Sequence, residues 1–490
     1  MKPPSLAFSI LVTLAAFLAS SANAQQQAAN QKPNIVHIVA DDLGWKDVGF
    51  NGCTDIKTPN LDKLAATGAK FTQFYVQPMC TPTRAALMTG RYPFRYGLQT
   101  IVIPTAASYG LDTSEYLIPQ CLRDAGYKTA IIGKWHLGHA DRKYWPKQRG
   151  FDYQYGAMIG ELDYFTHDEH GVLDWFRDNK PVHEKGYTTQ LIGADAVKYI
   201  NEQSPNKPFY LYLAFNAPHT PYQAPKEYVE RYPNIADLTR RTYAGMVTCL
   251  DDEIGKVVAA LDKKGLRENT LILFNSDNGG TTNAMFAGQM ADLSKTKLPC
   301  DNGPYRDGKG SLFDGGTLVC ALANWPGHIK AQTVKGLIHA VDIYPTLAKL
   351  AGASTEKCKP LDGVDVWDTI AEDKPSPRTE FIYNVEPFRG AVRQGDWKLI
   401  WRTMLPSSVD LYNLAEDPYE KNNVAAAHPD KVAEMQARLE AAGKESAKPL
   451  ALLWIGQTAM KSAIPLLPTD EGLYTDDDAD PALPKIGNEH

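Results

Sequence analysis

The stretch NIVHIVADD, residues 34–42, is a run of β-branched and other apolar residues that ends in two aspartates. Such a run predicts a strand buried on both faces, as in the middle of a parallel sheet. Three later runs have the same form, and each is followed at once by polar residues; they span 128–132, 209–215 and 270–275. Helical patterns separate these runs, for example over 238–264. We therefore predict an α/β domain in which helices flank a mostly parallel sheet.

The residues that follow the four predicted strands form a candidate site, because parallel strands end at one edge of the sheet and ligands bind there. The side chains expected at this edge are Asp41 and Asp42, then Lys134 and His136, then His219, then Asp277 and Asn278. The three carboxylates and the amide of this set offer only oxygen atoms, which suits a hard divalent cation, calcium or magnesium. For either pair alone, turn and capping chemistry is the ordinary explanation.

Cys80 opens the stretch CTPTR, which begins a helical pattern over 83–89 that Gly90 stops. Pro82 suits the first turn of a helix, where a missing N–H costs little. A cysteine at this place feels the positive end of the helix dipole, and Arg84 can point back at the same spot. Cys80 is therefore the candidate nucleophile. A thiolate is nevertheless a poor match for a hard, oxygen-bound cation, because thiolates prefer softer metals.

Basic residues complete an anion site beside this cation. Lys134, Lys309 and Arg84 can bind and neutralise oxyanion charge. His136 and His219 can move protons near neutral pH. Each lysine alone is more ordinary as a surface group and each histidine as a loop residue. Combined with the carboxylate pairs, they favour hydrolysis of an anionic ester.

Residues 1–24 have the composition of a secretory signal peptide, with Lys2 as their single charge, an apolar run over 6–18 and a small-x-small pattern before Gln25. We expect cleavage there and a secreted or periplasmic protein. No later stretch approaches membrane-spanning length, and the net charge of −6 includes no basic block, which argues against a membrane span and against nucleic-acid binding. The seven cysteines include no CxxC pair, so a structural zinc site is not expected.

A proline-containing linker near residues 372–377 divides the rest of the 490 residues. We expect a catalytic domain over 32–371. After the linker, a hairpin over 390–401 and a following helix predict a small α+β domain over 378–450, made of an antiparallel sheet and a helix. Residues 451–490 hold many prolines and an acidic run, and receive no structural prediction.

The segment 140–186 is rich in aromatic and acidic residues and has little periodicity. A long irregular segment in a compact domain is often functional, with an ordered surface loop as the alternative. Its candidates for the pocket wall are Asp163, Tyr164, His167 and His170. Farther along, the pattern predicts a strand over 318–322 and a helix over 338–350.

These motifs resemble those of the sulfatase family, from about residue 33 to about residue 425. The matching motifs are DDLG (41–44), CTPTR with LMTGR (80–91), GKWHLG (133–138), SDNGG (276–280), and Lys309 with Gly315 and Gly316. Within the family, three stretches look most like the N-acetylgalactosamine-4-sulfatases, the arylsulfatase B type; they are QPMCTP (77–82), YAGMV (243–247) and LDGVDVW (361–367).

The resemblance implies an answer to the cysteine problem. In this family a formylglycine-generating enzyme converts the cysteine after translation to formylglycine, an aldehyde whose hydrate is a hard oxygen ligand. The implied cofactor is one Ca²⁺ per active site, and its implied ligands are Asp41, Asp42, the modified Cys80, Asp277 and Asn278. The implied fold is the alkaline-phosphatase-like α/β domain with a small C-terminal α+β domain.

The resemblance also implies a role for each of the remaining residues. Arg84 and Lys134 would steady the hydrate, and His136 would take a proton as the hemiacetal breaks down. His219 and Lys309 would hold the sulfate ester, and one of the two would aid the leaving oxygen. Cys80, Arg84 and His136 are thus the expected catalytic residues. Lys134, His219 and Lys309 are the expected substrate-binding residues.

We therefore expect a secreted enzyme that hydrolyses sulfate esters of carbohydrates. Sulfated galactosamine glycans are the first expected substrate and sulfated algal galactans the second. A phosphatase or phosphodiesterase of the same fold is one alternative, although such enzymes generally use serine or threonine and two zinc ions. An inactive sulfate-binding homologue is the other, and it would be expected to lack a core residue.

Overall fold

The computed structural model describes residues 32–169, 171–283 and 298–463. The signal peptide predicted over 1–24, the pocket candidate His170 and most of the C-terminal tail lie outside these described residues.

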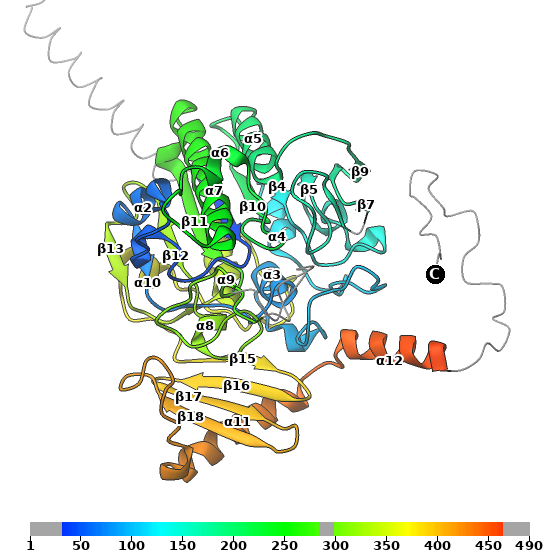
Figure 1. Cartoon of the computed structure of the whole chain (residues 1–490), viewed down its shortest axis with the longest axis vertical. Helices are drawn as coiled ribbons and strands as arrows, with labels where there is room; N and C mark the ends of the chain where they lie inside the picture. The colour runs from blue at the N-terminus through cyan, green and yellow to red at the C-terminus, as the bar shows by residue number, and fades with distance from the viewer. Residues whose placement is uncertain (1–31, 170, 284–297, 464–490) are drawn as a thin grey trace, which may run out of the picture.

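A large twisted sheet forms the central layer of the larger domain (Figure 1). Five neighbouring strands in its middle, β11, β1, β10, β4 and β5, run parallel. Strand β12 joins β11 antiparallel at one side, and β8 joins β5 antiparallel at the other. The strands described in this sheet are, in spatial order, β13 (Gln332–Val334), β2 (Ala69–Phe71), β12 (Ala321–Asn324), β11 (Thr270–Ser276), β1 (Asn34–Ala40), β10 (Phe209–Ala214), β4 (Lys128–Gly133), β5 (Tyr153–Gly156), β8 (Phe176–Arg177) and β9 (Lys180–Pro181).

Helices cover both faces of this sheet, because the side chains of its strands alternate between two apolar clusters. In β1, Ile35 and Val39 belong to one cluster, whereas Val36 and Ile38 belong to the other. The first cluster packs under α3 (Cys80–Thr89), α4 (Ile118–Asp124) and α9 (Ile343–Leu350). The second packs under α2 (Pro59–Ala66), α5 (Thr188–Asn201), α6 (Lys226–Val229) and α7 (Leu238–Lys263).

The predicted α/β class is confirmed, and the four strands predicted to end at the site are β1, β4, β10 and β11. The shorter elements of the domain are β3 (Phe74–Tyr75), β6 (Asp168–Glu169), β7 (Val172–Leu173), β14 (Ile338–His339), α8 (Asp314–Thr317) and α10 (Trp367–Glu372).

Two predicted elements were placed wrongly. The strand expected over 318–322 begins at Ala321, because the N–H of Leu318 still donates to the carbonyl oxygen of Asp314, the first residue of α8. The helix expected over 338–350 begins at Ile343. The residues before it first pair with β3. They then make a 3₁₀ turn, which is capped because the imidazole of His339 accepts a hydrogen bond from the N–H of Val341.

A four-stranded antiparallel sheet and the helix α11 (Pro429–Lys444) form the small C-terminal domain below the large sheet in Figure 1. Its strands, in order, are β15 (Glu380–Val385), β16 (Arg389–Gln394), β17 (Trp397–Arg402) and β18 (Ser408–Asn413). Phe381 and Tyr383 of β15 pack around Tyr75 of the larger domain, so the two domains share one apolar cluster.

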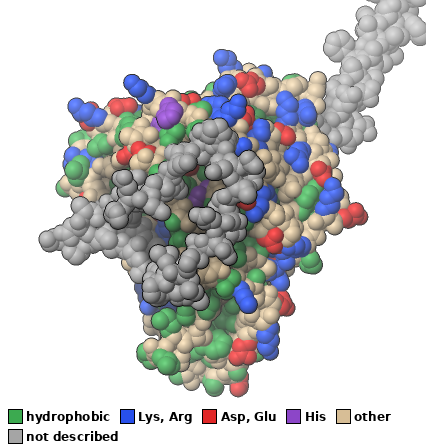
Figure 2. Space-filling model, turned by 90° about the vertical axis from the view of Figure 1, so that its right-hand side faces the viewer, with side chains coloured by type: hydrophobic (Ala, Val, Ile, Leu, Met, Phe, Trp, Pro, Cys, Tyr) green, Lys and Arg blue, Asp and Glu red, His purple; other side chains and the backbone are tan. Residues whose placement is uncertain are grey.

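Beyond the small domain, residues that received no prediction form the helix α12 (Leu450–Ala463), which reaches away from the body in Figure 1. In the ranges that the structure describes, no helix is both long and apolar enough to cross a membrane. Basic and acidic side chains are interspersed over the visible face in Figure 2.

Candidate active site

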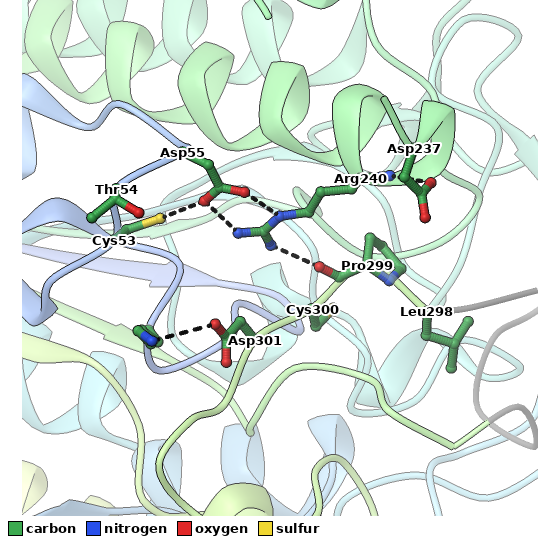
Figure 3. Close-up of a pocket in the computed structure, with 10 residues that line it drawn as sticks. Cys53, Thr54, Asp55, Asp237, Arg240, Leu298, Pro299, Cys300 and Asp301 are labelled. Carbon is green, nitrogen blue, oxygen red and sulfur yellow. Dashed lines mark hydrogen bonds and ion pairs between the residues drawn. The ribbon is translucent and has the colours of Figure 1, made fainter. Parts of the chain in front are cut away.

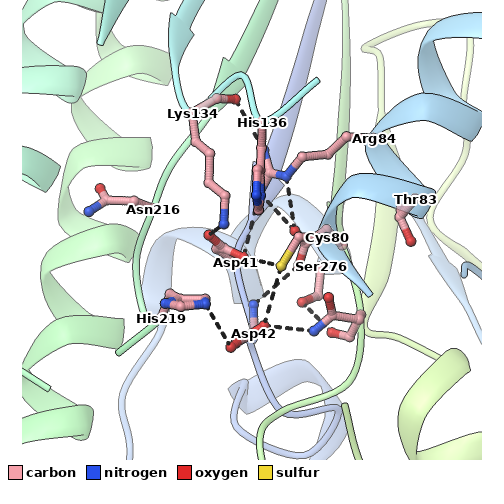
Figure 4. A network of polar contacts seen from close by, with 12 residues as sticks. Asp41, Asp42, Cys80, Thr83, Arg84, Lys134, His136, Asn216, His219 and Ser276 are labelled. Carbon is pink, nitrogen blue, oxygen red and sulfur yellow. Dashed lines mark hydrogen bonds and ion pairs between the residues drawn. The ribbon is translucent and has the colours of Figure 1, made fainter. Parts of the chain in front are cut away.

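Helix α3 places Cys80 at its first position, at the edge of the sheet where the parallel strands end (Figure 4). The helix is longer than predicted, because it begins at Cys80 rather than at Thr83. Gly90 ends it with a φ of 66°, a left-handed conformation that glycine adopts without strain. Every residue of α3 is buried, so Cys80 lies inside the protein and faces the residues that follow the strands.

The Cys80 thiol lies between the two aspartates that follow β1. Its Sγ is 3.4 Å from Oδ1 of Asp41 and 4.0 Å from Oδ1 of Asp42. Burial raises the pKa of the thiol well above its ordinary value, and the nearby carboxylate of Asp277 adds to this. Burial and carboxylates thus outweigh the helix dipole, and an unmodified thiol here is neutral and a weak nucleophile at neutral pH.

Each buried carboxylate of the site is held by a cation of its own. Lys134 donates to Asp41 over 2.5 Å. Lys309 donates to Asp42 over 2.8 Å. Arg84 donates to Oδ2 of Asp277 through Nε and Nη2, over 3.1 and 2.8 Å.

These ion pairs set the charge of the site. Burial would raise the pKa of Asp42, but Lys309 and His219 outweigh it and hold the pKa below the ordinary value. At Asp277, burial and the neighbouring Asp41 raise the pKa in spite of Arg84. The raised pKa of Asp277 indicates that the neighbouring carboxylates still repel one another in spite of their paired cations, and a bound positive charge would reduce this repulsion.

Asn278 leaves a buried oxygen atom without a donor. Its Nδ2 donates to Oδ1 of Asp42 over 2.7 Å, but its Oδ1 has no hydrogen-bond partner among the described residues. Ligand atoms of Asp41, Asp42, Cys80 and His219 all lie within 4.8 Å of one another. Because a bare amide oxygen beside carboxylates is what a hard cation binds, these residues fit a Ca²⁺-type ion.

His219 and Lys309 form a pair above Asp42. The Nδ1 of His219 lies 2.7 Å from the carbonyl oxygen of Thr220 and donates to it, so its Nε2 accepts from Nζ of Lys309 over 3.0 Å. Burial lowers the pKa of His219 to about 4, and Lys309 adds to this. Burial also lowers the pKa of Lys309, but Asp42 outweighs it and raises the pKa above its ordinary value. At neutral pH the pair is a neutral imidazole and a protonated amine.

His136 presents an unpartnered nitrogen to the site. Its Nε2 lies 3.1 Å from the carbonyl oxygen of Ile103 and donates to it, while its Nδ1 is buried and has no partner in the described chain. Burial lowers the pKa of His136 well below 6.5, and Lys134 and Arg84 add to this. A Cβ at position 160 would lie 2.3 Å from Cε1 of the ring, so Gly160 is required for this orientation. His136 is therefore a neutral base next to Cys80 (Figure 4).

A cavity of about 210 Å³ opens over Cys80, His136, His219 and Lys309. The irregular segment 140–186 does reach this cavity, but through Ile159, Gly160, Glu161 and Glu169. The three candidates within that segment that the structure describes, Asp163, Tyr164 and His167, act as supports instead.

Tyr164 donates to the carbonyl oxygens of Asn216 and His219, over 2.8 Å each. His167 bonds to the carbonyl oxygen of Gly186 and stacks on Trp175. Asp163 accepts hydrogen bonds from nearby backbone N–H groups and from Gln223.

The sequence interpretation also missed two polar residues of the site. Thr281 donates to Oδ2 of Asp42 over 2.9 Å, and its position directly after the SDNGG motif was the available signal. Asn216, which directly follows the residues predicted for β10, is buried with both side-chain polar atoms unpartnered in the described part of the chain.

A larger cavity, of about 600 Å³, lies beside Arg240, Cys53 and Cys300 (Figure 3). Its charges are paired with one another: Arg240 donates to Asp47, to Asp55 and to the carbonyl oxygen of Pro299. Burial raises the pKa of both thiols. The described residues around this cavity therefore offer no free nucleophile or base, and the smaller cavity over Cys80 is the candidate active site.

Comparisons with known proteins agree with this geometry. A sulfatase family model matches residues 33–353, and a model described as N-sulphoglucosamine sulphohydrolase, C-terminal, matches residues 308–446. Arylsulfatase J of Mus musculus is 37% identical over 394 residues, which are 78% of this chain and 63% of that protein. The chain thus spans less than two thirds of that relative's length.

N-acetylgalactosamine-6-sulfatase of Mus musculus is 35% identical over 392 residues, which cover 76% of this chain and 72% of that protein. Among solved structures, Ps i-CgsB in complex with k-i-k-neocarrahexaose superimposes with a TM-score of 0.78 and 35% identity, covering 89% of this chain and 98% of that one.

Proposed function

Since the chain belongs to the sulfatase family, we propose that it hydrolyses sulfate esters of carbohydrates by means of a formylglycine made from Cys80 and one Ca²⁺. The observation that carries this proposal is the setting of Cys80, a thiol that cannot readily ionise among hard oxygen ligands and fixed cations. Such a setting suits an oxygen nucleophile better than a sulfur one.

The proposed ligands of the cation are Asp41, Asp42, Asp277, Asn278 and the modified side chain at position 80. The bare Oδ1 of Asn278 supports this assignment. When bound, the cation would supply positive charge that polarises a sulfate oxygen and lowers the pKa of a bound hydroxyl. Lys134 and Arg84 would hold Asp41 and Asp277 in their ionised, ligating form.

The protons of the reaction would move through His136 and Lys309. The free Nδ1 of His136 is the base, and it would take a proton from the hydroxyl of the side chain at position 80 as the sulfate leaves. Lys309 is the acid, because it is protonated and donates to the neutral His219. It would give a proton to the sugar oxygen that leaves, while His219 would orient the amine and the ester.

The proposed substrates are sulfated galactosamine glycans, with sulfated algal galactans second. One similar protein is named as an N-acetylgalactosamine-6-sulfatase, and one similar structure holds k-i-k-neocarrahexaose. Both the 4-sulfate, suggested by the sequence motifs, and the 6-sulfate are therefore candidates. A panel of defined 4-sulfated and 6-sulfated oligosaccharides, with released sulfate measured, identifies the position.

Export and maturation complete the proposal. The protein would be secreted or periplasmic after removal of residues 1–24, and a formylglycine-generating enzyme would be its partner during maturation. N-terminal sequencing of the exported protein should begin at Gln25. A product that retains Lys2 would contradict the predicted cleavage.

Peptide mass spectrometry together with two chromogenic substrates tests the chemistry. The peptide that contains position 80 should carry an aldehyde or its hydrate, and the protein should hydrolyse nitrophenyl sulfate in preference to nitrophenyl phosphate. Full activity with an unmodified cysteine would refute the mechanism. A preference for phosphate would favour the phosphatase alternative. No turnover by aldehyde-bearing protein would favour the sulfate-binding alternative.

A further inference from the structure

A second cavity adjoins the catalytic cavity at Lys309. Lys309 lines the cavity over Cys80, and it also lines a cavity of about 400 Å³ that lies between residues 307–313 and the strands β16 and β17 of the small domain. The N–H of Gly310 donates to the carbonyl oxygen of Pro78 over 2.8 Å, which keeps this loop beside the start of α3. A substrate held at Cys80 that extended past Lys309 would reach the second cavity beside the small domain.

Two arginines on the small domain face this second cavity. Arg389 and Arg402 are register partners in the antiparallel pair of β16 and β17, so their side chains leave the same face of the sheet. Like charges directly opposite one another destabilise a sheet. An anion bound between or beside them would offset this repulsion.

The two arginines differ in how many of their donors are in use. Arg389 uses all three of its nitrogens, because it donates to Glu386 through Nε and Nη2 and to the carbonyl oxygen of Gly310 through Nη1. Arg402 donates only Nη1, to Asp410 over 2.6 Å, and its Nε and Nη2 have no hydrogen bond among the described residues. Its guanidinium lies 5.5 Å from the ring centre of Phe313, and its side chain is 36% exposed.

The lining of the catalytic cavity includes a charge of the other sign. Glu161 lines the cavity with His219 and Lys309, and it has no hydrogen-bond partner in the part of the chain that the structure describes. A second anionic group of a substrate would be repelled on this side and attracted on the side of Arg402. The second cavity is lined by Lys309, Arg389 and Arg402 and by one acidic residue, Asp307, so its balance of charge favours an anionic chain on that side.

We propose that Arg402, beside the anchored Arg389, binds a second anionic group of the substrate on a sugar next to the one that loses its sulfate. This inference rests on the proposed function, since it extends the same site. The group is a sulfate or a carboxylate, because the free Nε and Nη2 of Arg402 match two oxygens of either one. The preferred substrate is then an anionic oligosaccharide rather than a single sulfated sugar.

Calorimetric binding of two hexasaccharides to full-length protein tests this site. One probe is a carrageenan hexasaccharide, which carries sulfates only, and the other is a chondroitin sulfate hexasaccharide, which also carries carboxylates. Arg402→Gln should raise Kd by about tenfold for at least one probe at low salt, and the difference should shrink at high salt. If Arg402→Gln weakens binding of the chondroitin probe alone, the site binds carboxylates. If it weakens binding of the carrageenan probe, the site binds sulfates.

Arg438→Gln is the matched control, because Arg438 is 38% exposed, belongs to the small domain and is also paired with one carboxylate, that of Glu380. It should leave Kd unchanged. No binding of either probe to the wild type, an unchanged Kd in Arg402→Gln, or an equal loss in both variants would overturn the proposal.

Turnover of nitrophenyl sulfate separates this inference from the proposed function. Its kcat/KM should be the same in the wild type and Arg402→Gln, because this small substrate does not reach the second cavity. A wild type that binds the hexasaccharides through Arg402 but turns over no sulfate ester would refute the proposed function alone.

Discussion

Two clusters of buried charge in this protein look alike in composition and differ in one respect. The catalytic cluster, at the ends of the parallel strands, consists of Asp41, Asp42, Asp277, Arg84, Lys134 and Lys309. The interdomain cluster consists of Asp314 on α8, Lys398 on β17 and Glu420 after β18. Both clusters pair carboxylates with cations away from water.

The interdomain cluster has a cation or a donor beside every carboxylate oxygen. Lys398 lies 2.6 Å from Oδ1 of Asp314 and 2.7 Å from Oε1 of Glu420. Tyr75 donates to Oδ2 of Asp314 over 2.9 Å, and the N–H of Asp314 donates to Oε2 of Glu420 over 2.7 Å. This cluster joins the two domains and offers nothing to a ligand.

The catalytic cluster instead leaves polar atoms bare. The Oδ1 of Asn278 and the Nδ1 of His136 are buried and without partners among the residues described. An unmet buried polar atom destabilises a fold, so it persists where a ligand or a reaction uses it. Glu420 Oε1 of the interdomain cluster makes no hydrogen bond either, but it is ion-paired with Lys398 at 2.7 Å. What distinguishes the catalytic cluster is therefore a neutral amide oxygen and an imidazole nitrogen that have no partner among the described residues.

The largest expected difference between the clusters concerns activity. Cys80→Ala should lower turnover of nitrophenyl sulfate by about 10⁴-fold or more, because the group that becomes the nucleophile is removed. The melting temperature should change little, since alanine suits a helix. Cys249→Ala, at a buried cysteine of α7, is the control and should keep its activity. Residual turnover of Cys80→Ala near the wild-type rate would contradict the role of position 80.

Lys398→Met should give the opposite result, a loss of stability with activity preserved in the folded fraction. Removing the ammonium leaves two buried carboxylates without their cation, which costs about 3–5 kcal/mol. Urea unfolding measures this loss, and a nitrophenyl sulfate assay normalised to folded protein measures activity. Lys374→Met, at an exposed ion pair, should change neither quantity. An unaltered unfolding midpoint for Lys398→Met would show that the cluster does not join the domains.

The sequence predicts the catalytic cluster far better than the interdomain one. Each strand that leads to the catalytic cluster is an apolar run with its polar residues directly after it, so local pattern and sheet geometry suffice. Lys398 lies within a strand, in WKLIWR, where a lysine ordinarily faces solvent. Its partner Asp314 is 84 residues away, and nothing local marks the pair.

The orientation of the side chains within the site also cannot be predicted from the sequence. His136 was predicted at the site, but its free Nδ1 depends on a hydrogen bond to Ile103, 33 residues earlier, and on the missing side chain at Gly160. Residue type favours Asp163, Tyr164, His167 and His170 as the pocket wall, and the structure describes the first three. These residues instead support the wall, because their polar groups are used in local hydrogen bonds.

A smaller expected effect concerns the stabilisation by Ca²⁺. It should depend on Asn278, whose amide oxygen has no hydrogen-bond partner among the described residues, and not on an amide that is fully hydrogen-bonded. Addition of Ca²⁺ to metal-free wild type should raise the melting temperature by several degrees, since an ion that binds only the folded state stabilises it. Asn278→Ala should lose at least half of this shift, because one oxygen ligand is gone. Thermal melts with and without Ca²⁺ measure the effect.

Asn384→Ala is the control for this experiment. Asn384 is buried, and its amide donates to the carbonyl oxygen of Gln99 and to Glu386. Its removal should lower the melting temperature equally with and without Ca²⁺, because a satisfied hydrogen bond is lost. If Ca²⁺ raises the melting temperatures of the wild type and of Asn278→Ala by the same amount, then Asn278 is not a ligand of the ion.

The smallest expected effect is a pH dependence within the interdomain cluster. Burial raises the pKa of Glu420 above its ordinary value, and Asp314 adds to this in spite of Lys398. A raised pKa in the folded state means that the group favours folding most at low pH. Its contribution is full below the ordinary pKa of a glutamate and falls as the pH rises through the folded-state value. Glu420→Gln, which resembles the protonated carboxyl, should remove this decline.

Urea unfolding of wild type and Glu420→Gln at pH 5 and pH 8 measures the difference. At pH 5 the two proteins should have similar unfolding free energies. At pH 8 the unfolding free energy of the variant should exceed that of the wild type by about 1 kcal/mol or more, the equivalent of one unit of pKa. Glu434→Gln, at an exposed glutamate paired with Lys431, should show no such gain. If Glu420→Gln instead loses stability as the pH rises, then Glu420 is ionised in the folded protein and Lys398 dominates its titration.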